Sequence, residues 1–208
     1  MERMNRGFTL IELLVSVAIF AFMTALLVAK YGTFNQSVLL TNLGYDVAIS
    51  IRTAQTYGVS VVSPESATNP NPSFKYAYGV DFTTVANPSL STDPQQILLF
   101  SSTSNPDSLY YKAGGVDTPL NVYSIKRGAV IYDLCTGHDS TSCAHVDQLD
   151  VSFKRPDPSA IICSTVISGG SSVCGGASNT YAKITIRGTD GSTRFVTVLS
   201  NGQVTVEN

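Results

Sequence analysis

The feature that most constrains this chain is an apolar run near its N-terminus, from Phe8 to Ala29. Its 22 residues contain one ionisable side chain, Glu12. At a rise of about 1.5 Å per residue, a helix of this length spans roughly the 30 Å hydrocarbon core of a bilayer. We therefore expect a membrane-spanning helix at residues 8–29. An acidic residue inside a span costs on the order of a few kcal/mol, so Glu12 needs a functional explanation.

Basic residues on either side of the run indicate its orientation. Arg3 and Arg6 precede it and only Lys30 follows closely, which places the N-terminus in the cytoplasm and the rest of the chain outside. A secretory signal peptide and a plain signal anchor are the simpler interpretations. The run is longer than the apolar region of a signal peptide, and no convincing A-x-A site follows it. A plain anchor leaves Glu12 unexplained.

The start of the run resembles the processing and polymerisation signature of type IV pilins and type II secretion pseudopilins. The matching residues are Arg6-Gly7-Phe8-Thr9-Leu10-Ile11-Glu12-Leu13-Leu14-Val15. The resemblance implies that a prepilin peptidase cuts on the cytoplasmic side after Gly7, that Phe8 is then N-methylated, and that Glu12 becomes the fifth residue. It also implies an inner-membrane protein that enters a pilus or pseudopilus, with sibling subunits, an assembly platform and a cytoplasmic ATPase as partners.

Cleavage would supply a partner for Glu12. The new amine on Phe8 is charged at neutral pH and keeps its charge when methylated. The Glu12 carboxylate can accept a charge-assisted hydrogen bond from the Phe8 amine of a neighbouring subunit, in the low dielectric among packed apolar helices. We expect this pair to set the axial register between subunits. Alternatively, Glu12 reaches the membrane interface from its place near the end of the span.

An amphipathic pattern predicts that the helix continues beyond the membrane to about Tyr57. Apolar residues recur there at spacings of 3, 4, 4 and 3: Leu40, Leu43, Val47, Ile51 and Ala54. Gly58 is the predicted stop, and the Pro-rich stretch 63–72 continues neither helix nor central strand. Gly32 and Gly44 each weaken the helix by about 1 kcal/mol relative to Ala and are candidate points of bending or melting.

The rest of the chain predicts strands and turns. The predicted strands are residues 74–82, 96–101, 129–134, 149–153, 160–167, 181–187, 194–199 and 203–206. Asp190-Gly191 and Asn201-Gly202 are strong hairpin signals. We expect an α+β fold of pilin type, with the N-terminal helix packed on an antiparallel sheet. The predicted organisation is a leader at 1–7, a transmembrane helix at 8–29, its amphipathic continuation at 30–62 and an exported β-rich domain at 63–208.

Three segments narrow the resemblance to the minor pseudopilin H and FimT-like minor pilins. They are residues 43–62, 149–153 and 194–204, which resemble the helix end and the last strands of that group. A major pilin and another kind of minor pilin are the alternatives.

Cys135, Cys143, Cys163 and Cys174 all follow the span, and an even count in an exported domain predicts disulfides. Of three connectivities, Cys135 with Cys143 and Cys163 with Cys174 is favoured, because each pair brackets a turn-rich loop. The alternative is a zinc site formed by Cys135, His138, Cys143 and His145, although this spacing matches no common zinc pattern.

No catalytic motif is present, so we expect a structural subunit that is not an enzyme and needs no cofactor. A signal-anchored exported enzyme and a calcium-binding protein are weaker alternatives, and Asp147 and Asp150 are expected to be solvated or in turns. The other alternative is a DNA-binding minor pilin of a DNA-uptake pilus. Its phosphate contacts would come from Lys183, Arg187 and Arg194, despite a net charge of -2.

Overall fold

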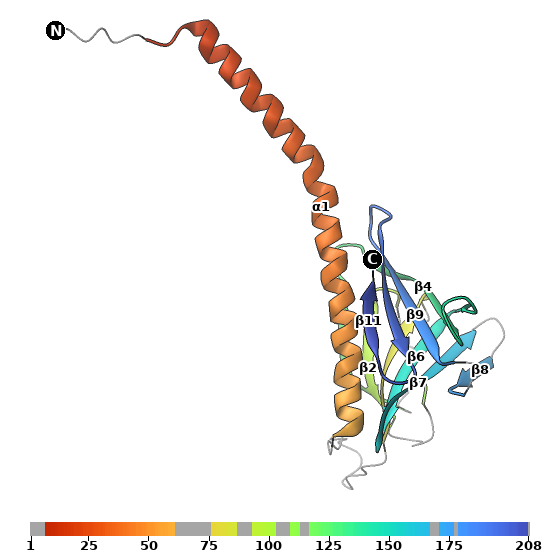
Figure 1. Ribbon diagram of the computed structural model, residues 1–208. Coiled ribbons are helices and arrows are strands. Elements are labelled where there is room, and N and C mark those ends of the chain that lie inside the picture. The colour runs from red at the N-terminus through yellow and green to blue at the C-terminus, as the bar shows by residue number, and fades with distance from the viewer. Residues whose placement is uncertain are drawn as a thin grey trace.

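The computed structural model describes residues 7–60, 76–86, 93–102, 109–112, 117–166, 171–176 and 179–207, without the side chains of residues 30–34 and 171. Leader residues 1–6 and the Pro-rich stretch 63–72 lie outside this range, as do residues 74, 75 and 167 of the predicted strands. The described part combines one long helix with two antiparallel sheets (Figure 1), which confirms the α+β prediction.

Helix α1 (Leu10–Val59) is 50 residues long and runs without interruption through Gly32 and Gly44. The predicted stop was Gly58, but the helix continues to Val59. Ser60 is its C-cap, and the Ser60 N–H donates to the Thr56 carbonyl oxygen at 2.9 Å. Gly58 has a different role, because a Cβ there would lie 2.6 Å from Cβ of Phe153 and 2.8 Å from its carbonyl oxygen. A glycine is therefore needed where the helix touches a strand.

The eleven strands of the described part form two sheets where the sequence predicted one. The first has the order β3-β2-β1-β6-β7-β8 and the second β11-β10-β9-β4-β5. The strands are β1 (Tyr78–Thr83), β2 (Gln96–Ser101), β3 (Thr118–Ser124), β4 (Val130–Gly137), β5 (Ala144–Val146), β6 (Gln148–Lys154), β7 (Asp157–Val166), β8 (Ser171–Cys174), β9 (Tyr181–Arg187), β10 (Thr193–Leu199) and β11 (Val204–Glu207). Three of these strands were not predicted from the sequence, and all three lie at sheet edges: β3, β5 and β8.

One hydrophobic core joins the helix to both sheets. The predicted stripe forms the helical side of this core, and each of its residues is at most 5% exposed: Leu40, Leu43, Val47, Ile51 and Ala54. Figure 1 shows the C-terminal half of α1 lying along the sheets and the N-terminal half extending away from them. The chain therefore buries one half of its helix and leaves the other half bare.

The last three strands form consecutive hairpins, as the turn dipeptides predicted. Gly191 and Gly202 have φ values of 83° and 84°, which is the left-handed region that glycine adopts without strain. β9 pairs with β10, and β10 with β11, on either side of these turns.

Candidate functional site: the N-terminal segment and the bare helix

The predicted cleavage position lies in an extended, open segment before the helix. Thr9 is the N-cap of α1, and its Oγ1 accepts a hydrogen bond from the Glu12 backbone N–H at 3.3 Å. A Cβ on Gly7 would have no heavy atom within 4 Å, and Phe8 is 77% exposed. The peptide bond between these two residues is therefore outside the helical hydrogen-bond network and accessible to a protease.

Glu12 occupies the third helical position, where the positive N-terminal end of the helix dipole stabilises a carboxylate. Its Oε2 accepts a hydrogen bond from the Thr9 hydroxyl at 3.5 Å. Among the side chains described for α1, no cation lies within ion-pairing distance of this carboxylate. The acid is thus available for a partner outside its own subunit.

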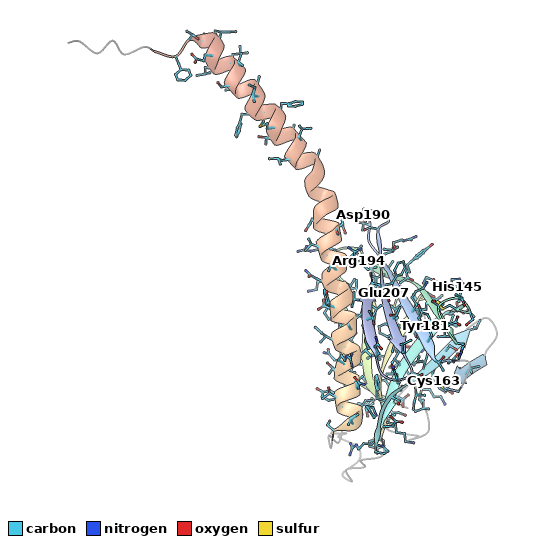
Figure 2. All side chains as sticks on the ribbon, in the orientation of Figure 1. His145, Cys163, Tyr181, Asp190, Arg194 and Glu207 are labelled. Atoms are coloured by element: carbon cyan, nitrogen blue, oxygen red, sulfur yellow. A yellow bond between two sulfur atoms is a disulfide. The ribbon has the colours of Figure 1, made fainter. Side chains whose placement is uncertain are left out.

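The first half of α1 has no cover from its own chain. Leu10–Ala29 is long and apolar enough to cross a membrane, and none of it is buried inside the structure. Figure 2 shows side chains projecting around this part of the helix, well away from the sheets. Such a helix is stable only in lipid or against apolar helices of other subunits.

The cysteines form the two local disulfides that the sequence favoured. Cys135 is bonded to Cys143 across the β4–β5 hairpin, and Cys163 to Cys174 across β7 and β8. The zinc alternative is therefore wrong, because two of its four ligands are consumed in a disulfide. His145 instead contacts Asp133, with Nδ1 and Oδ1 2.7 Å apart, and His138 lies beside Thr180. Among the described residues, no three His, Cys, Asp or Glu side chains are placed to hold a metal ion.

The three candidate DNA-contacting cations are divided between two surfaces. Lys183 and Arg187 lie on β9 at positions four residues apart, so their side chains share one face of the sheet. The Arg187 guanidinium lies 3.7 Å from the ring centre of Tyr132, and Lys183 Nζ lies 5.4 Å from that of Phe195. Arg194 lies beside the helix instead (Figure 2), where it donates to the hydroxyls of Thr41 and Ser37 at 3.4 Å.

The comparisons with known proteins identify the N-terminal segment. Residues 3–28 match the family model of the prokaryotic N-terminal methylation motif. The chain carries the type IV pilin signature. Neither the curated proteins nor the solved structures contain a match to this pilin-like precursor. The motif covers the predicted cleavage position, Glu12 and most of the bare helix. It is characteristic of structural, non-enzymatic subunits that prepilin peptidase processes and that assemble with other pilins.

The pilin-like precursor contains a pair of buried carboxyl groups that its sequence pattern did not predict. Asp150 was predicted to be solvated or in a turn, which is wrong, because it is fully buried and directly opposite Asp81 in the β1–β6 pairing. Gln148 Nε2 donates to Asp81 Oδ1 at 2.7 Å, and the Tyr111 N–H donates to Asp150 Oδ1 at 3.0 Å. Gln148, Asp150 and Ser152 alternate with apolar residues along β6, a pattern that is typical of a strand with one solvent-facing side. Residues 109–112 cover that side instead.

Burial raises the pKa of both carboxyl groups. The pKa of Asp81 rises to about 6 because burial disfavours its charged form, although hydrogen bonds from Gln148 and Asp150 oppose the shift. The pKa of Asp150 rises well above its usual range, first through burial and then through the negative charge of Asp81. Because the two acids lie opposite each other, ionisation of one raises the pKa of the other, and they titrate as a pair.

Proposed function

We propose that this chain is a minor structural subunit of a type IV pilus or a type II secretion pseudopilus. Prepilin peptidase cuts it after Gly7, Phe8 is N-methylated, and the helix then leaves the inner membrane and packs among the helices of sibling subunits. An assembly platform and a cytoplasmic ATPase drive this step, and the β-rich domain stays outside the cytoplasm. The observation that carries the proposal is a methylation motif at the start of an apolar helix that its own chain leaves bare.

The geometry at the helix start supports a pairing of Glu12 with Phe8 of a neighbouring subunit. Glu12 and Phe8 are both exposed, and the carboxylate has only a 3.5 Å contact to a hydroxyl within α1. Cleavage places a cationic amine on Phe8, and among apolar helices that amine and Glu12 are each other's strongest available partners. The pair would align subunits along the fibre axis.

Mass spectrometry of the mature protein tests the processing step. The protein extracted from membranes of its own cells should begin at Phe8 and carry one methyl group on its N-terminal nitrogen. A catalytically inactive prepilin peptidase provides the control, since the leader should then be retained in full. An intact leader in cells with an active peptidase would contradict the proposal.

A DNA-binding role is the second candidate, and one observation favours it. Lys183 and Arg187 share one face of β9 with Tyr132 and Phe195 beside them, so cations and aromatic rings lie together. If this face contacts phosphates, Arg187→Ala should weaken DNA binding and lower its salt dependence. Arg194→Ala is the matched control, because that side chain is engaged with α1. Equal losses in both variants, or no binding at low salt, would exclude this surface as the DNA site.

A further inference from the structure

Residues 109–112 cover the face of the first sheet on which the two buried acids lie, and we call them the cover segment. The Tyr111 N–H donates to Asp150 Oδ1 at 3.0 Å, and the Ser152 hydroxyl donates to the Leu109 carbonyl oxygen at 2.6 Å. Both bonds use a side chain of β6, and neither belongs to a strand ladder. These contacts can therefore break without separating any two strands, which makes local opening easier than unfolding of the domain.

A small hydrophobic cluster completes the attachment of the cover segment. The ring centre of Tyr111 lies 5.3 Å from that of Phe100 on β2, and both side chains are buried. Together with Leu98 they form a cluster that is separate from the main core. Leu98 and Phe100 lie opposite Asp81 and Gly79 in the β1–β2 pairing, so the cluster shares its face of the sheet with the acids. Movement of the cover segment would expose Leu98 and Phe100 to water.

The two carboxyl groups under the cover segment have no positive charge to balance them. Asp81 and Asp150 are 2% and 0% exposed, and among the described residues no cation forms an ion pair with either. On the neighbouring strands they lie opposite Leu98 and Cys163, and the Cys163 sulfur is in a disulfide and does not titrate. Asp150 Oδ2 is buried and accepts no hydrogen bond, which favours the protonated acid. Both acids can be ionised together only if water reaches them.

The other titratable groups near the pair add little positive charge. Asp117 is 3% exposed and accepts a hydrogen bond from the Lys112 N–H at 2.7 Å, so a third acid lies beside the cover segment. Burial raises the pKa of Asp117, and the hydrogen bond and charge of Lys112 only partly oppose this. The Lys112 ammonium group lies 4.7 Å from the ring centre of Tyr110. The pKa of the Tyr111 phenol is raised by burial and then by the charges of Asp81 and Asp117. Negative charge therefore prevails around the pair, and each further ionisation adds repulsion.

We propose that the Asp81–Asp150 pair makes the cover segment a pH-sensitive switch, which is closed while the pair retains a proton and opens when both acids are ionised. Opening lets water reach the carboxylates and exposes Leu98 and Phe100. The strands stay paired, because alternate residues of β1 and β6 belong to the main core on the other face of the sheet. The switch is a property of the folded domain and does not depend on the proposed function.

The direction of the switch follows from proton linkage. The pKa of Asp81 is raised to about 6 in the closed state, and that of Asp150 is raised well above its usual range, in both cases first by burial. The closed state is therefore favoured at low pH and is lost as the pH rises through about 6 and above.

Hydrogen–deuterium exchange with mass spectrometry tests the switch on the full-length protein in detergent. After correction for the pH dependence of chemical exchange, the Tyr111 and Lys112 amides should lose protection between pH 5 and pH 8. Once the last proton of the pair is lost, the decrease should be on the order of tenfold per pH unit. The amides of β9 and β10 should keep their protection. An equal loss in both regions would overturn the inference, because the acids would then loosen the whole domain.

Substitutions of the acids separate the switch from general instability. Asp150→Asn should keep the cover segment protected at both pH values, because the amide stays neutral while its oxygen still accepts from Tyr111. Asp81→Asn removes the same repulsion from the other strand and should give the same result, so one folded variant is sufficient. Asp139→Asn is the matched control, because it removes a charge from an exposed acid and should retain the wild-type response. Unchanged protection in the wild type, or an equal loss in the variants of the pair, would overturn the inference.

Hydroxyl-radical footprinting measures the exposure of the side chains independently. Oxidation of Phe100, normalised to that of the exposed Tyr132, should increase between pH 5 and pH 8 in the wild type and stay constant in Asp150→Asn. Constant oxidation of Phe100 in the wild type would contradict the opening.

Discussion

At the scale of single residues, substitutions at Glu12 and Gly7 should distinguish the processing step from the assembly step. Glu12→Ala and Glu12→Gln should both be cleaved after Gly7 but assemble on the order of a hundredfold less, because an unpaired Phe8 amine among apolar helices costs about 3 kcal/mol. Gln retains the side-chain length and the ability to accept a hydrogen bond from Thr9, so it is the control for helix capping. A bulky residue at Gly7 should block both steps. Quantitative immunoblots of processed and assembled fractions measure these effects, and normal assembly of Glu12→Gln would contradict the ion pair.

At the scale of elements, the contact between α1 and β6 depends on Gly58. Gly58→Ala should destabilise the folded domain by about 1–3 kcal/mol, because the added methyl group meets the backbone of Phe153 and the helix must move away. Gly44→Ala is the control. Its methyl group meets a side-chain carbon of Val206 at 2.9 Å, and the gain in helix propensity of about 1 kcal/mol offsets part of that cost. Thermal melts of the full-length protein in detergent, followed by near-UV circular dichroism, should show the larger fall for Gly58→Ala; equal shifts would contradict the close approach.

At the scale of the whole molecule, the Asp81–Asp150 pair makes folding stability depend on pH. Both pKa values are raised on folding, so the stability is fully present below the unfolded pKa near 4 and is lost as the pH rises through about 6 and above. The melting temperature should therefore fall between pH 5 and pH 8. Asp150→Asn should flatten this dependence, because a neutral amide imitates the protonated acid while still accepting from Tyr111. The exposed acids whose pKa values are lowered, including Asp139, affect stability only at pH values below this range. A pH dependence of equal size in the variant would rule out the pair as its source.

The features that could be predicted from the sequence depend on local hydrophobic periodicity and on the residues that form turns. The predicted helical stripe is the buried stripe, since a period of 3.6 residues determines which side chains share a face. The hairpins at Gly191 and Gly202 follow from the left-handed backbone that those turns require. The local disulfides follow from short loops between cysteines. The edge strands β3, β5 and β8 were missed because strands at an edge have weak burial patterns, and β3 is largely exposed on both faces.

The sequence by itself determined the long apolar helix and the methylation motif at its start, because each depends on residues that are neighbours in the chain. Cleavage after Gly7 and the fifth mature position of Glu12 are predictions from the same local residues. Only the tertiary structure decided which polar residues are buried and which cations share a surface. Asp150 is buried because a segment some forty residues earlier covers its face, and Arg194 faces α1 because of the register between β9 and β10. Neither arrangement leaves a local signal, since burial depends on what a distant part of the chain places over a residue.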